Sequence, residues 1–219
     1  MMARRSSGRV WFVAVSVALV AVSGAHAQRR DKSYDKGMKA QELDPSQRGP
    51  VSGVGIESQD IIGMTDRMVR DMLSNPQLAG RATPPRVIVD DQYFTNESSQ
   101  RLNKRIITDR LRVNLNRASN GRMMFVGREF AAMIAQEREL KREGVTDVGT
   151  TGLTKAQAGV DFRLTGRITS EDSAAQDGTG RIQRFNQITF EMVDLESGVI
   201  VWSNLYDFAR VAADSVVYR

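Results

Sequence analysis

Few residues in this sequence are candidates for chemistry. The clearest are Asp90 and Asp91, which follow the apolar segment at 86–89. Acids often lie at the carboxyl ends of strands in α/β enzymes. The sequence supplies no set of partners with which these two could hold a metal, so we interpret them as solvating the end of a strand. There is no cysteine, and the one histidine is His26.

Residues 1–27 have the layout of an export signal. Arg4, Arg5 and Arg9 form a basic start, 10–22 is an apolar run, and a small-residue site at 25–27 predicts cleavage between Ala27 and Gln28. An uncleaved amino-terminal anchor is the alternative, although the apolar run is short for a membrane span. Removing the three arginines from 31 basic residues leaves 28, against 26 acidic residues. This near balance argues against a protein that wraps a polyanion.

After cleavage the chain would contain neither histidine nor cysteine. Ser/His/Asp and Cys/His catalysis, thiolate or imidazole zinc sites and disulfides are then excluded. The segment GVGIES at 53–58 lacks the third glycine and the preceding strand of a dinucleotide loop. Lys155 with Ser170 or Ser173 is not spaced as a Ser-x-x-Lys pair. The sequence therefore predicts no enzyme, no cofactor and no metal site.

Residues 28–55 are polar and contain too few large apolar residues to collapse, so we expect a disordered linker before one domain at 56–219. Hydrophobic periodicity predicts the elements of that domain. The expected helices are 58–73, 98–118 and 128–142, with a short piece at 154–159, and the expected strands are 86–90, 122–127, 160–170 and a hairpin at 192–204. This order predicts an α/β fold with a single mixed sheet flanked by helices.

Two of the expected helices have distinct faces. In 128–142, the apolar residues Phe130, Met133, Ile134 and Leu140 fall together and should be buried. The helix at 98–118 buries an apolar stripe, and its other face is basic, with only Asp109 as a nearby acid. The residues of this basic face are Arg101, Lys104, Arg105 and Arg112. It is either a solvated surface or a contact for an acidic partner.

Four segments in order resemble the LpoB-type activators of penicillin-binding proteins. They are RVIVDDQYFTNESSQRLNKRIITDRLRVNL, GRMMFVGREF, KAQAGVDFRLTGRITS and ITFEMVDLESGVIVWSN, which ends in a hairpin with Gly198 at its turn and Trp202 on the return strand. The resemblance implies a fold related to the amino-terminal domain of TolB. It also implies a non-catalytic periplasmic module that stimulates a class A penicillin-binding protein, a peptidoglycan synthase, by contact.

The resemblance leaves the contact surface open. The basic face is one candidate, and the loop with Tyr93, Phe94 and Asn96 is the other. Members of the described type carry a lipid on a cysteine at the signal cleavage site, where this chain has Gln28, so we expect no lipid anchor. The alternative is a structural or secretion-assembly protein of the cell envelope, because CsgG-like proteins share a similar core and hairpin. A ring would favour that alternative, and a monomer, which we expect, would favour the activator.

Overall fold

The computed structural model describes residues 40–176 and 178–213. The expected signal peptide, its cleavage site at Ala27 and Gln28, and residues 28–39 of the expected linker lie outside the described residues. The chain divides into two units, Met1–Gln41 and Glu42–Arg219. The second unit contains all of the described helices and strands.

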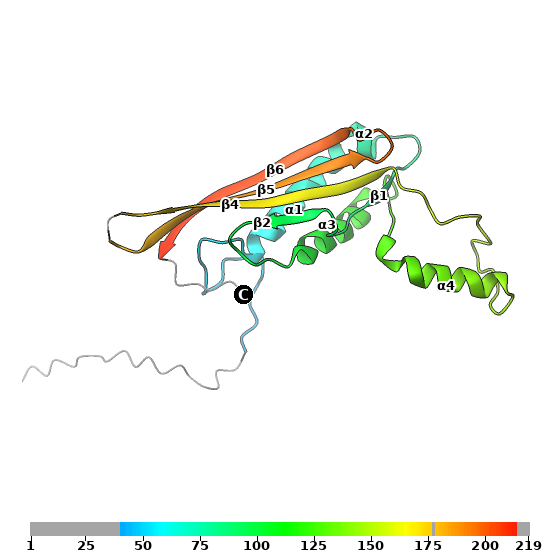
Figure 1. Ribbon diagram of the computed structural model, residues 1–219, viewed down its shortest axis with the longest axis horizontal. Helices are drawn as coiled ribbons and strands as arrows, with labels where there is room; N and C mark the ends of the chain where they lie inside the picture. Colours follow the sequence, from blue (N-terminus) through cyan, green and yellow to red (C-terminus); the bar gives the residue numbers. More distant parts are fainter. Residues whose placement is uncertain (1–39, 177, 214–219) are drawn as a thin grey trace, which may run out of the picture. The chain divides into compact units, whose positions relative to one another are not determined.

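The described residues of this unit form one mixed sheet of six strands in the order β3-β1-β4-β5-β6, with β2 paired to β4 (Figure 1). The pairs β1–β3, β1–β4 and β2–β4 are parallel, and β4–β5 and β5–β6 are antiparallel. The strands are β1 (Arg86–Ile88), β2 (Phe94–Glu97), β3 (Met124–Phe125), β4 (Phe162–Ala174), β5 (Arg181–Asp194) and β6 (Ile200–Ala213). The predicted α/β class with a single mixed sheet is confirmed.

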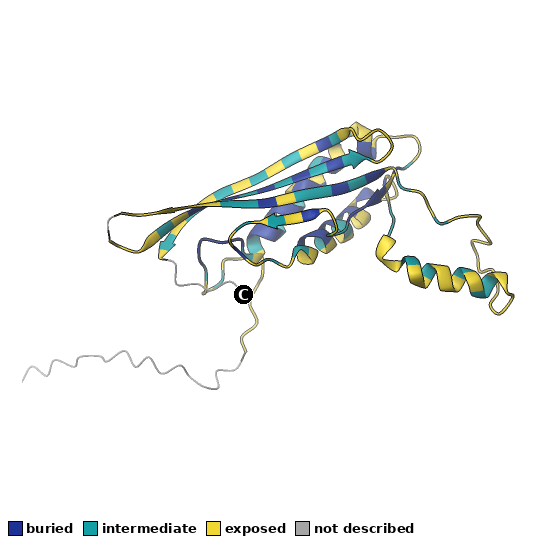
Figure 2. Cartoon of the chain, in the orientation of Figure 1, coloured by how far each residue is buried: buried dark blue, intermediate teal, exposed yellow. Residues whose placement is uncertain are grey.

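Helices α1 (Ser58–Ser74) and α3 (Lys104–Ser119) cover one face of the sheet (Figure 1). Alternate residues of the long strands point toward these helices, which produces the striped burial along β5 in Figure 2. The buried strand residues are Phe162, Leu164 and Ile168 on β4 and Ile188, Phe190 and Met192 on β5. Their helix partners are Met64, Met68 and Met72 on α1 and Ile107, Leu111 and Leu115 on α3. Within the part of the chain that the structure describes, no helix covers the opposite face of β4 and β5.

Strand β6 is held to α1 by buried polar contacts. Trp202 is 6% exposed, and its indole N–H donates to Asp71 Oδ2 at 2.7 Å. Asn204 donates to the same oxygen at 2.8 Å. Nearer the start of α1, Arg210 donates to both oxygens of Asp60, at 2.6 and 2.8 Å. The hairpin tryptophan is therefore a core residue that joins β6 to the helical layer.

The predicted second helix begins later than expected. Residues 94–97 form β2 instead of a loop, and α3 starts at Lys104 after Asn103, whose side chain accepts from the Arg105 N–H at 3.1 Å. Arg101 therefore lies before the helix. The expected loop with Tyr93, Phe94 and Asn96 is a strand from Phe94 onward, because β4 offers an edge on which this segment pairs in parallel register.

The region between β3 and β4 also departs from expectation. A single 3-10 turn, η1 (Arg128–Phe130), precedes α4 (Ala131–Arg142), and no residue of α4 is buried. Phe130 is 47% and Met133 63% exposed, so their predicted burial is wrong. The expected short helix at 154–159 is irregular, because that segment serves as acceptor for arginines: Arg138 and Arg142 both donate to Thr154 O at 3.0 Å.

The folded core begins earlier than the expected linker boundary at residue 55. Val54 and Ile56 are 1% and 3% exposed. The side chain of Gln100 pairs with both backbone groups of Ile56, at 2.7 and 2.9 Å, and Asn186 donates to Val54 O at 3.0 Å. The expected linker included Val54 because an isolated apolar residue between two glycines gives no periodic signal.

The turn between β5 and β6 has the conformation that its glycine predicts. Gly198 has φ +74, and its N–H donates to Asp194 O at 2.9 Å. The Asp194 side chain accepts the backbone N–H groups of Ser197 and Glu196 at 2.8 and 2.9 Å. These hydrogen bonds, that from Ser197 first, hold the pKa of Asp194 below its ordinary value of 3.8.

Gly198→Ala should destabilise the domain by about 1 kcal/mol, because a Cβ is unfavourable at positive φ. The matched control is Gly63→Ala within α1, where φ is helical and an added Cβ meets nothing within 4 Å. Alanine is favoured over glycine inside a helix by about 1 kcal/mol. Urea unfolding should therefore shift in opposite directions for the two variants, and a shift in the same direction would contradict the assigned turn.

A chain that begins at Ser52 should unfold at the same temperature as one that begins at Gln28. A chain that begins at Glu57 should lose about 3 kcal/mol or more, because it lacks the buried Val54 and Ile56 side chains and leaves Gln100 and Asn186 without their partners. Calorimetry of the three chains makes the comparison. Equal stability of the shortest chain would show that 53–56 adds nothing to the core.

Candidate partner-binding surface

A hollow of about 370 Å³ lies on the face of β4 and β5 that no helix covers. Its floor is the backbone at Gly166, and side chains of β2, β4, β5 and the loop before β2 surround it. They are Tyr93, Thr95, Thr165, Arg167, Thr189 and Glu191. The strand register explains the grouping, because Thr95 and Thr189 both pair with Arg167, and Thr165 pairs with Glu191.

The side-chain position of Gly166 points away from the hollow, toward the helices. A Cβ there would lie 2.2 Å from Cε2 of Phe94, whose ring occupies the opposite, helix-facing side of the strand. Phe94 is 1% exposed and contacts Phe190 with ring centroids 5.4 Å apart. Phe94, one of the predicted partner-binding residues, is therefore a core residue, because the alternation of the strand points its side chain toward the helices.

Tyr93 points the other way and is 53% exposed at the rim of the hollow. The guanidinium of Arg163 lies 4.6 Å from the centroid of its ring. Nη2 of Arg163 also donates to Asp90 Oδ2 at 2.9 Å and Gln92 Oε1 at 3.0 Å. Asp90 thus holds an arginine beside the end of β1, and the structure brings Tyr93, but not Phe94, to the open surface.

The two charged residues of the hollow differ in their surroundings. Nε of Arg167 lies 3.8 Å from Glu97 Oε1, a distance typical of an exposed ion pair. Glu191 is half-buried, and within the described part of the chain its carboxylate makes no hydrogen bond or ion pair. The hydroxyl of Thr165 donates to the backbone oxygen of Glu191 at 3.4 Å, not to its carboxylate.

The third residue of the predicted loop site has a structural role. Asn96 is half-buried, and its Nδ2 donates to Gln100 O at 2.7 Å. Its Oδ1 accepts from the Ser98 N–H at 3.1 Å and from the Ser98 hydroxyl at 2.7 Å. Asn96 therefore closes the turn that leads from β2 toward α3.

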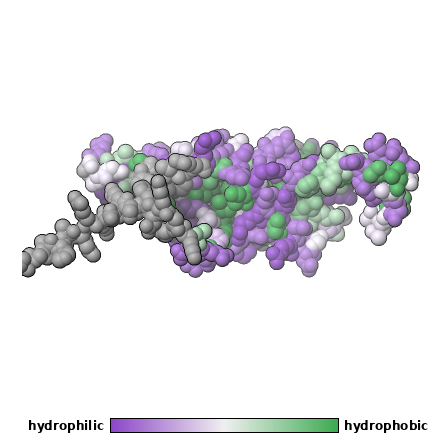
Figure 3. All heavy atoms as spheres, turned by 90° about the horizontal axis from the view of Figure 1, so that it is seen from below, coloured by the Kyte–Doolittle hydropathy of each residue, from purple (hydrophilic) through white to green (hydrophobic). Residues whose placement is uncertain are grey.

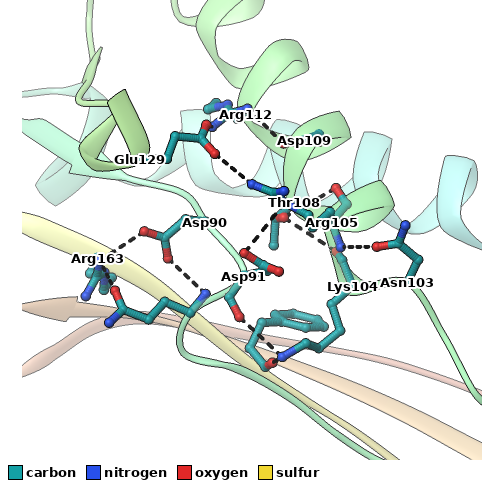
Figure 4. Close-up of polar contacts among 12 residues, drawn as sticks. Asp90, Asp91, Asn103, Lys104, Arg105, Thr108, Asp109, Arg112, Glu129 and Arg163 are labelled. Atoms are coloured by element: carbon teal, nitrogen blue, oxygen red, sulfur yellow. Dashed lines mark hydrogen bonds and ion pairs between the residues drawn. The ribbon is translucent and has the colours of Figure 1, made fainter. Parts of the chain in front are cut away.

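The basic residues predicted on α3 meet acids from outside the helix (Figure 4). Glu129 of η1 lies between Arg105 and Arg112, with one carboxylate oxygen 2.9 Å from the first and the other 2.5 Å from the second. Arg112 also pairs with Asp109 at 2.7 Å, and Arg105 lies 3.9 Å from Asp91. The expectation that Asp109 is the only nearby acid was wrong, because Glu129 is distant in sequence.

The remaining two basic residues are also separated by the structure. Nζ of Lys104 donates to the backbone oxygens of Phe94 and Asp91, so it fastens the loop before β2 to the start of α3 (Figure 4). Arg101 lies outside the helix and is exposed, and no ion pair forms at its side chain within the described residues. The predicted basic face is therefore a network of paired charges with one separate arginine.

Sequence reasoning missed the side chains of the hollow other than Tyr93. The period-two alternation of 162–169 and 187–192 could have placed Thr165, Arg167, Thr189 and Glu191 on the same side of the sheet. The register that sets Glu191 opposite Thr165 has no signal in a single sequence.

The other surfaces offer weaker candidates. Apolar side chains of the η1 and α4 region are exposed, but on the face seen in Figure 3 hydrophilic residues break the hydrophobic surface into separate patches. Within 40–176 and 178–213, no three acidic or histidine side chains are grouped as a metal site. In the same ranges, no helix combines the length and hydrophobicity needed to cross a membrane.

Comparison with known proteins gives the family. The family described as peptidoglycan-synthase activator LpoB matches residues 60–208, which is well over half of the chain. No curated protein matches.

Solved structures with a similar fold include two LpoB C-terminal domains. That from Salmonella enterica is 20% identical, with a TM-score of 0.40, and the match covers 68% of this chain and 98% of that one. That from Escherichia coli is 18% identical, with a TM-score of 0.39 and the same coverage. Lipoprotein GNA1162 from Neisseria meningitidis is 17% identical, with a TM-score of 0.30, covering 61% and 88% of the two chains. On the match over residues 60–208, this chain belongs to the LpoB family of peptidoglycan-synthase activators.

Proposed function

We propose that this protein is a non-catalytic periplasmic binding module that activates a class A penicillin-binding protein in peptidoglycan synthesis. The observation that carries the proposal is the extent of the family match. Residues 60–208 include nearly all of α1, the whole of β1 to β5 and most of β6. The matched segment is thus the folded unit itself, with its helical layer, its sheet and the open face of β4 and β5.

The structure supports activation by contact. A sheet joined to α1 by buried polar pairs presents a fixed surface, and a fixed surface loses little conformational entropy when it docks. The loop at 91–93 separates the hollow from the basic network, since Tyr93 lines the first and Asp91 lies beside Arg105 of the second. A single partner surface could therefore cover both.

Periplasmic location and the absence of a lipid belong to the same proposal. They rest on the export-signal pattern and on Gln28 at the expected cleavage site, where the attachment of a lipid needs a cysteine. The activator would then reach its synthase without a membrane anchor of its own.

The test of function is reconstitution. Purified protein from residue 28 onward should bind a class A penicillin-binding protein from the same cells and raise its rate of glycan polymerisation. A monofunctional transpeptidase from those cells is the control, and it should be neither bound nor stimulated. Absence of binding to every class A synthase tested would refute the proposal.

The basic network is proposed as one part of the contact. R105E/R112E should lower the melting temperature by a few degrees, because Glu129 loses both partners and exposed ion pairs contribute up to about 1 kcal/mol each. It should also weaken binding to an acidic partner surface, with a loss that shrinks as salt is raised.

Glu129→Gln is the matched control for this double variant, since it breaks the same ion pairs and keeps both arginines. We expect a similar fall in melting temperature and unchanged or stronger binding. If both variants weaken binding equally, the effect comes from the position of η1 and not from contact with the arginines. Arg101→Glu, at a residue without an ion pair in the described structure, should leave the melting temperature unchanged.

A structural or secretion-assembly role is the second candidate, and the free edge of β6 favours it. This strand of 14 residues pairs only with β5 among the described strands, and Leu205 and Val211 on it are 45% and 62% exposed. Light scattering distinguishes the two roles, because the activator is proposed as a monomer and an assembly component would form a ring.

A further inference from the structure

We propose that the hollow over Gly166 receives a lysine or arginine side chain from a loop of the synthase. The inference rests on the proposed function and adds to it the chemical identity of the group that docks. The hollow is distinct from the basic network of α3, which would face acidic groups of the partner. The partner would then place a basic side chain in the hollow and acidic groups against the basic network.

The first support is the shape of the site. Thr165 and Arg167 of β4 stand on either side of the Gly166 backbone, which forms the floor between them. The Phe94 ring fills the strand's other side, so the floor is backed by packed core. The volume of about 370 Å³ is large enough to hold one long side chain.

The second support is an uncompensated charge. The strand neighbours of Glu191 are Thr165 on β4 and Ser203 on β6, neither of which is charged. Its carboxylate is half-buried and makes no hydrogen bond or ion pair within the described residues. A carboxylate in such a position is stabilised by an incoming cation, which supplies both charge and hydrogen-bond donors.

The neighbouring arginines do not cancel this charge. Arg163 is occupied by Asp90 and Gln92 at 2.9 and 3.0 Å. Arg167, diagonal to Glu191 across the β4–β5 pair, lies beside Glu97 instead. Each of these two arginines already lies beside another acid, Asp90 or Glu97. Within the described hollow, the carboxylate of Glu191 is therefore the charged group available to a partner.

The third support is the lining. The Tyr93 ring already accepts a guanidinium at 4.6 Å, which shows that a cation is compatible with its electron-rich face. The hydroxyl oxygens of Thr95, Thr165 and Thr189 can accept from an ammonium or guanidinium. A neutral sugar could use the same hydroxyls but would leave the Glu191 charge without a counter-ion, so the lining and the charge together favour a basic side chain.

The test compares Glu191→Gln with Glu171→Gln in binding to the class A synthase. Glu171 is an exposed residue of β4 that also lies without an ion pair in the described structure, beyond the hollow and opposite Phe185. Both changes remove one negative charge. We expect the first to weaken binding at least tenfold, with a smaller loss at high salt, and the second to change it less than twofold. Neither should alter the melting temperature.

Direct titration of the hollow separates this proposal from the proposed function. The amide signal of Gly166 in an NMR spectrum should shift on addition of acetyl-arginine amide to the whole protein and should not shift in the Glu191→Gln variant. Equal binding by both glutamine variants, with normal binding by the unchanged protein, would overturn the hollow as the docking point and leave the activator role standing. A shift produced by oligomers of N-acetylglucosamine and not by the arginine derivative would assign the hollow to a saccharide instead.

Discussion

The ring of Phe94 lies where a side chain at position 166 would otherwise be, and the pairing of β2 with β4 depends on this contact. On the helix side, the ring joins Phe190 in the core and lets β2 pair closely with β4. On the other side, the Gly166 backbone lies between Thr165 and Arg167 in the lining of the hollow. Packing density in a protein core leaves no room for both a phenyl ring and a Cβ. The core therefore requires glycine at position 166.

The fold followed from the sequence wherever one face of an element is buried. Methionines at 64, 68 and 72 predict α1 because they recur at the period of a helix, and Gly198 predicts a left-handed turn because other residues avoid one. The prediction failed where pairing between distant segments decides the outcome. The residues at 94–97 are polar enough to indicate a loop, and only the unoccupied edge of β4 makes them a strand.

The candidate site was harder to predict for the same reason. A helical wheel of 98–118 places four basic residues on one face, but it cannot show that Arg101 lies before the helix or that Glu129 pairs with Arg105 and Arg112. Tyr93 could be chosen from its loop, whereas Glu191 becomes notable only when the strand register shows uncharged neighbours on both sides. Ion pairs between elements form only in the tertiary structure. A count of charged residues along one helix therefore overstates how many of them are available to a partner.

Strands β4 and β5 continue well beyond the hollow. Toward the far ends of these strands, an ion pair takes the place of apolar packing on the helix-facing side. Arg184 is 7% exposed, and it donates to both oxygens of Asp172, at 2.6 and 2.7 Å. These hydrogen bonds hold the pKa of Asp172 below its ordinary value of 3.8. The contribution of these hydrogen bonds to stability is complete above pH 3.8 and is lost as the pH falls through the lowered pKa of Asp172. The far ends of the strands should therefore loosen only in strong acid.

The unpaired side of β6 has a consequence for the behaviour of the protein in concentrated solution. An exposed strand edge is a template on which another chain can add, and natural proteins protect such edges with charges and local capping. Here Asn204 Oδ1 accepts the Leu205 N–H at 2.7 Å, which removes one donor from the edge, and Asp207 places a charge beside it. Solubility of this domain therefore depends on a few polar groups that contribute little to its fold, and their loss would produce aggregates of molecules that are still folded.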